Sequence, residues 1–230
     1  MSTPSERSPE RPRRPRAAWG RPAASEPRWQ ARLAIVVAAL LYLTLPSRYT
    51  LGPVWLFPSL EMLVLVVLIV GIPTRLGQTW TRVVAIGLIA ILNLANFVSL
   101  ALLVERLLHG KNVLGTELLY SSISIWVTNV IVFALWYWEL DRGGPDERRR
   151  ANHPEPDFLF PQMVTPGCAL ESWTPVFVDY LYVAFTNATA FSPTDTMPLT
   201  PWAKMLMLVQ SVVSLLTITL VAARAVNILS

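Results

Sequence analysis

The sequence predicts an all-α polytopic integral membrane protein, a bundle of about six transmembrane helices that follows a disordered basic tail. Of its 230 residues, 53% are hydrophobic and only 15% are charged, whereas a soluble domain carries about 25% charged residues. The mean hydropathy is +0.45. The apolar residues also fall in long runs, which favours membrane helices over the core of a soluble domain.

Residues 1–30 are rich in proline, arginine, serine and glutamate. Such a segment buries too little apolar surface to offset the entropy of ordering, so we expect a disordered cytoplasmic tail. A protein-binding tail is the alternative. The formal net charge of +4 lies in this tail and between apolar runs, where positive charge sets membrane orientation. The expected partner is therefore the lipid bilayer, and no nucleic acid is expected.

Four apolar runs follow the tail and predict a four-helix membrane region over residues 31–140. The fourth run ends in an aromatic cluster beside the first charges, WYWE, which is typical of a membrane interface. The runs are Leu33–Leu45, Val54–Ile72, Trp80–Leu108 and Leu118–Leu140.

Arginine-bearing segments orient the predicted spans. Arginines occur in the N-terminal tail, in the connection 73–82 and in the polar, proline-rich loop 141–174. The positive-inside rule places these three segments in the cytoplasm. Residues 175–190 either cross the membrane fully or re-enter it from one side. Under this orientation, a membrane hairpin over residues 175–230 would cross outward and return. Its turn would be external, and both chain ends would be cytoplasmic.

Glu61 is the most conspicuous acid within an apolar run. An intramembrane carboxylate can act as a proton or cation relay. Glu61 also follows Pro58 and Ser59, so it can instead lie in a first helical turn, where the macrodipole stabilises an anion. Three asparagines in the runs can either hydrogen-bond between helices or bind an ion; they are Asn93, Asn96 and Asn129.

Neither histidine has the neighbours of a metal site. His109 lies in a short connection, and the pattern around His153 is too weak to define zinc ligands. The sequence shows no Ser/His/Asp arrangement and no glycine-rich phosphate loop. We therefore expect no catalytic residue, no metal and no cofactor, and we do not expect an enzyme.

The C-terminal hairpin carries most of the functional signal. Its first apolar helix, Pro175–Phe185, is followed by a run of hydroxyl and amide side chains. Such groups can contribute ligands to a permeating ion, or can mark the point where a span reaches the outer surface. The candidates for a pore or polar path are Asp179, Thr186, Asn187, Thr189 and Asp195, together with Glu61.

The segment YLYVAFTNATAFSPTDTMPLTPWAKMLMLVQ resembles the pore region of potassium channels with two membrane helices per repeat. Alignment on Asp195 puts Thr189 at the first threonine of the family's filter. Ser192 and Thr194 stand where the family has glycines, and Pro193 stands where it has tyrosine. The family's filter needs backbone conformations that glycine adopts easily. The resemblance therefore implies a channel-like hairpin that is not selective for potassium.

The segments WYWELDRGGP and FVDYLYVAFTNATAFSPTD resemble an uncharacterised bacterial family of multi-pass membrane proteins. This resemblance implies a location in the bacterial inner membrane and no particular activity. Two functions stay open. One is a channel-like or transport-related protein whose hairpins line a path in a homo-oligomer. The other is a non-permeating membrane scaffold or accessory subunit.

Overall fold

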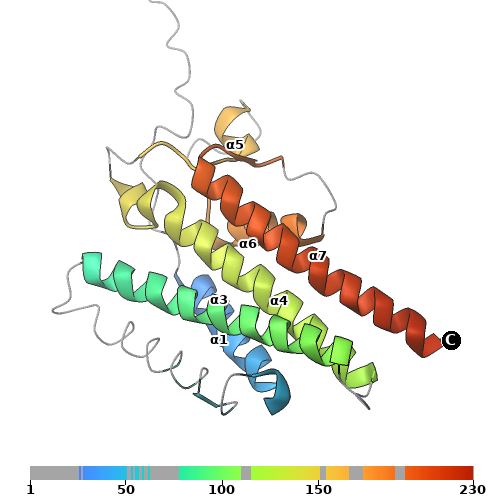
Figure 1. The fold of residues 1–230 in the computed structure, drawn as a ribbon. Helices are drawn as coiled ribbons and strands as arrows, with labels where there is room; N and C mark the ends of the chain where they lie inside the picture. The colour runs from blue at the N-terminus through green and yellow to red at the C-terminus, as the bar shows by residue number, and fades with distance from the viewer. Residues whose placement is uncertain are drawn as a thin grey trace, which may run out of the picture.

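The computed structural model describes residues 26, 28–50, 53, 55–56, 59, 62, 78–109, 115–150, 154–165, 173–189 and 195–229. Glu61, most of the predicted second run and most of the predicted tail lie outside the described residues. The described chain is mainly helical, as the sequence predicts (Figure 1). Its main helices are α1 (Trp29–Leu43), α3 (Gln78–His109), α4 (Gly115–Leu140), α6 (Phe177–Thr189) and α7 (Pro201–Leu229).

Shorter elements join these helices. The strands β1 (Phe158–Leu159) and β2 (Met197–Pro198) pair antiparallel, with Phe158 opposite Pro198. The remaining short elements are η2 (Ser47–Tyr49), η3 (Asp141–Gly143), η4 (Glu147–Arg149) and α5 (Pro161–Val164).

Among the described residues, three helical segments are long and apolar enough to cross a membrane. They are Arg82–His109, Thr116–Gly143 and Pro201–Ala222, and they coincide with the predicted third run, fourth run and last helix. The sequence-based expectation of about six spans is not matched by the described helices. The helix α1 has 15 residues and α6 has 13, so at 1.5 Å per residue each is roughly 20 Å long.

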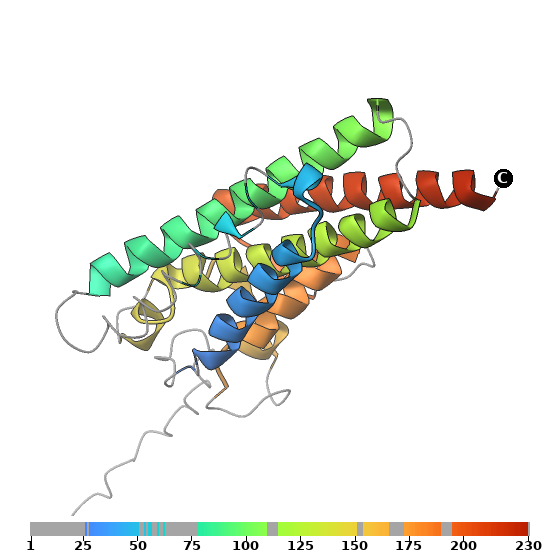
Figure 2. The ribbon, with the colours of Figure 1, turned by 90° about the horizontal axis from the view of Figure 1, so that it is seen from below.

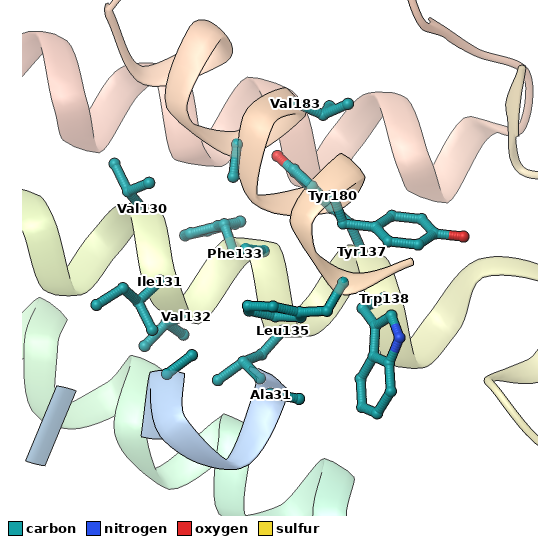
Figure 3. Packing of buried hydrophobic residues seen from close by; sticks show 14 of the residues in the cluster. Ala31, Val130, Ile131, Val132, Phe133, Leu135, Tyr137, Trp138, Tyr180 and Val183 are labelled. Atoms are coloured by element: carbon teal, nitrogen blue, oxygen red, sulfur yellow. The ribbon is translucent and has the colours of Figure 1, made fainter. Parts of the chain in front are cut away.

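The helix α4 is the centre of the bundle, and α1, α3, α6 and α7 pack around it (Figures 1 and 2). Its apolar stretch is 67% buried, against 22% for α7. Figure 3 shows Val130, Ile131 and Phe133 of α4 within this core. On α1 the face against the core is made of small side chains, which allow close approach of two helices; they are Ala31, Ala34 and Ala38.

All four surrounding helices begin at the end of α4 where that helix finishes. The Nε of Arg82, near the start of α3, lies 4.0 Å from the Oε1 of Glu139. Tyr180, near the start of α6, donates a hydrogen bond to Asp141. The described N-terminal segment joins them there through Arg28 and Asp146. We call this the basic end of the bundle, because it gathers Arg28, Arg82, Arg142 and the arginines 148–150.

The opposite, distal end holds a second apolar cluster. Leu103 near the end of α3 and Leu118 near the start of α4 are buried in it, and Leu220 of α7 packs against it. The helix α7 therefore runs from the basic end to the distal end. The described ends lie at opposite ends of the bundle, because Glu26 lies at the basic end and α7 finishes at the distal end. The structure therefore does not support the sequence-based prediction that both chain ends lie on one side.

The C-terminal hairpin also differs from its prediction. A full crossing by Pro175–Phe185 would put the turn at the distal end. Instead, β2 pairs with β1, and the Leu199 N–H donates to the Asp157 carbonyl oxygen at 2.8 Å. The strand pairing and this hydrogen bond both lie beside Asp141 at the basic end. The helices α6 and α7 thus start at the same end and run parallel, and α6 is too short to cross about 30 Å of hydrocarbon.

Candidate functional site

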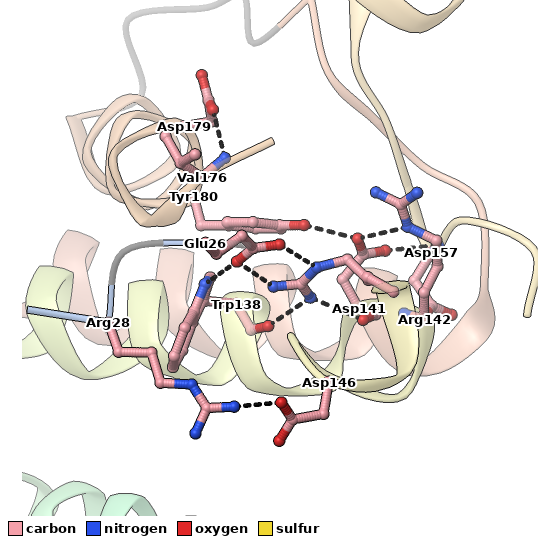
Figure 4. Close-up of polar contacts among 11 residues, drawn as sticks. Glu26, Arg28, Trp138, Asp141, Arg142, Asp146, Asp157, Val176, Asp179 and Tyr180 are labelled. Carbon is pink, nitrogen blue, oxygen red and sulfur yellow. Dashed lines mark hydrogen bonds and ion pairs between the residues drawn. The ribbon is translucent and has the colours of Figure 1, made fainter. Parts of the chain in front are cut away.

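A buried carboxylate at the end of α4 joins three elements. Asp141 is fully buried, and its Oδ1 accepts the backbone N–H groups of Asp157 at 2.9 Å and Phe158 at 3.3 Å. Its Oδ2 accepts the Tyr180 hydroxyl at 2.6 Å and the Arg142 Nε at 3.2 Å. A buried charge is tolerated when its oxygens are paired and hydrogen-bonded in this way. Asp141 thereby fixes β1 and α6 to the end of α4 (Figure 4).

A second acid, Asp157, extends this arrangement to α7. Its Oδ2 accepts the Arg142 N–H at 2.8 Å, and its Oδ1 accepts the Trp202 indole N–H at 3.0 Å. Trp202 is in the first turn of α7. The two acids therefore align the first turns of α6 and α7 on the same end of α4.

Arg148 lies beside Asp141 and is completely buried. Its Nη1 donates to the carbonyl oxygens of Trp138 at 2.7 Å and Asp141 at 2.9 Å. Its Nε and Nη2 donate to the two carboxylate oxygens of Glu26, each at 2.9 Å. The guanidinium also lies 5.4 Å from the centre of the Tyr180 ring, a cation–π distance.

The electrostatics of Arg148 favour its charged form. Burial by itself lowers the pKa of this guanidinium, but Tyr180, Glu26 and Asp141 outweigh burial and raise the pKa above its usual value. Arg148 is thus a fixed positive charge inside the protein. Removing a partner of such a charge is more costly than removing a surface ion pair.

The backbone turns sharply between α4 and η4. Arg142, Gly143 and Gly144 have φ values of 52°, 81° and 96°, in the left-handed region where glycine is favoured. A Cβ on Gly144 would lie 2.9 Å from the Glu139 carbonyl oxygen. The sequence DRGG thus allows the chain to fold back so that Arg148 enters the bundle.

A second polar group lies between α4, α6 and α7, nearer the middle of the bundle. The Gln210 Oε1 accepts the Tyr137 hydroxyl at 2.6 Å and the Asn187 Nδ2 at 2.7 Å. The Gln210 Nε2 donates to the Ala184 carbonyl oxygen at 2.8 Å, and the Ser211 hydroxyl donates to the Asn187 Oδ1 at 3.1 Å. We call these five residues the polar seam.

One helical turn or two toward the distal end, the Asn129 Nδ2 donates to the Ser214 Oγ at 2.9 Å. Interhelical hydrogen bonding is one of the two roles expected of the three asparagines, and Asn129 has it. On α3, the Asn93 Oδ1 and the Asn96 Nδ2 are buried without a hydrogen-bond partner among the described residues.

The structure separates the residues that the sequence nominated for a polar path. Asn187 lies in the polar seam. The hydroxyl groups of Thr186 and Thr189 donate to carbonyl oxygens of their own helix, at 2.8 Å and 3.1 Å respectively. Asp195 is exposed at the basic end, and Glu61 lies outside the described residues.

Asp179 has the role of a helix-capping acid. Its Oδ2 accepts the Val176 N–H at 2.7 Å, which satisfies a backbone donor just before the first turn of α6. Burial raises the pKa of Asp179, the Val176 N–H lowers it, and the charge of Glu26 raises it, with a net increase.

An open cavity lies between the starts of α3 and α7, over the end of α4. Its volume is about 720 Å³. Its walls are mainly apolar, with Trp136 and Leu140 on one side and Met205 and Val209 on the other, and Arg82 lies at its rim. Among the described residues, no group of three histidine, cysteine, aspartate or glutamate side chains is placed to hold a metal ion.

Sequence reasoning missed Asp141, Asp157, Arg148 and Gln210. Asp141 had a local signal, an acid at the end of an apolar run directly before Arg-Gly-Gly, which indicates a sharp turn. Arg148 had none, because a triplet of arginines after a membrane span is typical of an exposed loop. Comparison with known proteins adds no assignment: no family model, curated protein or solved structure matches this chain.

Proposed function

We propose that this protein is a multi-pass membrane protein with its basic end in the cytoplasm. Three helices of membrane-spanning length and composition support the location. The positive-inside rule supports the orientation, since cytoplasmic ends of spans carry an excess of arginine and lysine. At the distal end the basic residues of the described helices are fewer: Arg106 and His109 of α3 and Arg224 of α7.

Within this framework, the C-terminal region acts as a re-entrant hairpin that contributes to an ion path. The observation that carries the proposal is that α6 and α7 begin at the same end of α4, while α6 ends after 13 residues. A helix roughly 20 Å long that enters from one surface ends inside the hydrocarbon layer. The strand β2, which follows in the chain, lies back at the end of the bundle where α6 begins.

Ending a helix inside the hydrocarbon layer is energetically unfavourable unless the polar groups at its end are satisfied. The last carbonyl groups of an α-helix have no partner within the helix and carry partial negative charge. Non-helical backbone at membrane depth is tolerated only where protein surrounds it or where it lines a water-filled cavity. The end of α6, at Thr189, therefore favours a cation, and this is the part of the hairpin that resembles a channel pore.

The path is formed between copies of the chain. Within one copy, the side chains of the polar seam are hydrogen-bonded to one another and to the backbone, so an ion bound there would have to displace those bonds. The helix α7 is the most exposed of the three spanning helices. A second copy, or lipid, must cover its outward side chains, which include Leu208, Val212 and Leu215.

Cation flux tests this proposal directly. The purified chain in proteoliposomes is expected to pass Na⁺ and K⁺ without marked preference for K⁺. The double variant Thr189→Val, Asp195→Asn is expected to reduce the flux at least several-fold. It removes one polar group at the end of α6 and one just before β2. Glu155→Gln, an exposed acid outside the hairpin, is the matched control and should leave the flux unchanged.

Topology is tested by labelling single cysteines in a Cys168→Ser background. Cysteines at positions 195 and 149 should react with a membrane-impermeant reagent from the same side. A cysteine in place of Leu108, exposed near the end of α3, should react from the other side. Labelling of positions 195 and 149 from opposite sides would contradict the re-entrant hairpin.

A non-permeating scaffold or accessory subunit is the second candidate. It is favoured by the hydroxyl groups of Thr186 and Thr189, which donate within α6, and by the saturated amide of Asn187. In that case these groups stabilise helix packing only. Flux of the wild-type chain that does not exceed that of empty liposomes would support the scaffold and reject the channel.

A further inference from the structure

Three hydrogen-bond donors converge on one carboxylate at the basic end. The Arg148 Nε donates to the Glu26 Oε1, and the Arg148 Nη2 and the Trp138 Nε1 donate to the Glu26 Oε2, at 2.9, 2.9 and 2.8 Å (Figure 4). We propose that Trp138 and Arg148 form a carboxylate-binding site, which Glu26 of the same chain occupies and which a free carboxylate can fill in its place.

The arrangement of the donors selects for a planar anion. Two parallel N–H groups of a guanidinium match the two oxygens of a carboxylate, and this fork is rigid. The indole N–H adds a third donor to one of those oxygens. A monatomic anion such as chloride can accept from these groups but cannot satisfy the fork as a pair of oxygens does.

The binding half of the site is held in place without Glu26. The Arg148 Nη1 is anchored by the carbonyl oxygens of Trp138 and Asp141, and the ring of Tyr180 lies against the guanidinium. Tyr180 is itself bonded to Asp141. The two carbonyl contacts use Nη1, whereas the carboxylate is bound by Nε and Nη2. Loss of Glu26 would therefore leave an ordered, desolvated cation with its fork unpaired.

The ligand half comes from a distant part of the chain. Glu26 is 122 residues before Arg148 in sequence and precedes the first turn of α1 at Trp29. The next contact on that segment is the pair of Arg28 and Asp146, whose side chains are about one third exposed. Such a pair contributes little stability. The Glu26 side chain can thus be removed by substitution without disturbing the packing of α1.

Chemical rescue tests the proposal, with sodium formate as the probe. In the full-length chain in detergent, Glu26→Ala should lower the Tm by roughly 10 °C, since it leaves a buried charge unpaired. Formate should restore at least half of that loss, with saturation as its concentration rises. Sodium chloride at equal ionic strength should not.

Two controls make the outcome decisive. The double variant Glu26→Ala, Arg148→Met should show no formate-specific increase in Tm, and neither should the wild type. If Glu26→Ala does not fold, its refolding yield in formate, compared with that in chloride, becomes the readout. Equal effects of formate and chloride on the single variant, or an equal effect of formate on the double variant, would overturn the proposal. The readout is independent of ion flux.

Discussion

The side-chain amide of Asn187 donates to the Gln210 Oε1 across 2.7 Å, and this bond ties the inner part of α6 to α7. The amide of Gln210 returns a hydrogen bond to the backbone of α6 at Ala184. Two helices that start at the same end are thus fixed in register by a reciprocal pair of amides. Tyr137 adds α4 to the same oxygen.

Asn187→Leu should destabilise the protein by about 1–2 kcal/mol. It removes the bonds to Gln210 and Ser211, and interhelical hydrogen bonds within membrane proteins contribute about 0.6–1.7 kcal/mol each. Thr189→Val is the matched control on the same helix. Its hydroxyl donates only within α6, so the change should stay within about 0.5 kcal/mol. Thermal unfolding in detergent measures both, and equal losses would argue against the register role.

Arg148→Met should destabilise the protein by about 3–5 kcal/mol, because Glu26 is then buried without its cation. The neighbouring Arg149 is exposed, so Arg149→Met should change the free energy of unfolding by less than about 0.5 kcal/mol. Unfolding by denaturant compares the two. A small effect of Arg148→Met would mean that Glu26 is not held in the buried position.

Gly144→Ala should destabilise the protein strongly, and Gly87→Ala should not. At Gly144 the φ of 96° disfavours alanine, and the new Cβ would lie 2.9 Å from a backbone oxygen. At Gly87, within α3, a Cβ meets nothing within 4 Å, and alanine is the better helix former by about 1 kcal/mol. The Tm of the two variants should move in opposite directions.

Asp179→Asn should remove the contribution of this carboxyl group to the pH dependence of the free energy of unfolding. Burial raises the pKa of Asp179 in the folded state, whereas an unfolded aspartate titrates near about 3.9. Between the two pKa values the folded state binds more protons, so stability falls as pH rises through that window. Asparagine keeps an acceptor for the Val176 N–H.

The Tm of the Asp179→Asn variant should therefore gain on that of the wild type as pH rises from about 4. Parallel pH profiles of Tm for the two proteins would contradict a raised pKa. A wild-type protein that gains on the variant with rising pH would show that the carboxylate is stabilised by the fold.

The long helices could be predicted from sequence because their signal is local. The apolar runs of α3, α4 and α7 exceed the length that a membrane requires, and turn signals bound them. The depth of α6 could not be predicted. The polar residues from Thr186 onward fit a span that reaches the far surface as well as a helix that stops inside the layer. The pairing of β1 with β2, which brings the starts of α6 and α7 to the same end of α4, joins residues 40 positions apart.

The buried charges could not be predicted for a related reason. Asp141, Asp157 and Arg148 follow a membrane span, where charged side chains are usually solvated. Their burial depends on distant partners. Tyr180 lies 39 positions from Asp141, and Glu26 lies 122 positions from Arg148. Asn187 was nominated from sequence as a polar path residue, and its contact with Gln210 needs the parallel packing of α6 and α7.

The central place of α4 sets an order for biosynthesis. This helix is complete once residue 140 has left the ribosome, whereas α6 and α7 follow it in the chain. Because Tyr180 of α6 bonds to Asp141 and Trp202 of α7 bonds to Asp157, both of which precede these helices in the chain, the first part of the protein serves as a template on which the later helices dock. A chain interrupted between residues 165 and 173 would still present both docking partners, so separately made halves could assemble.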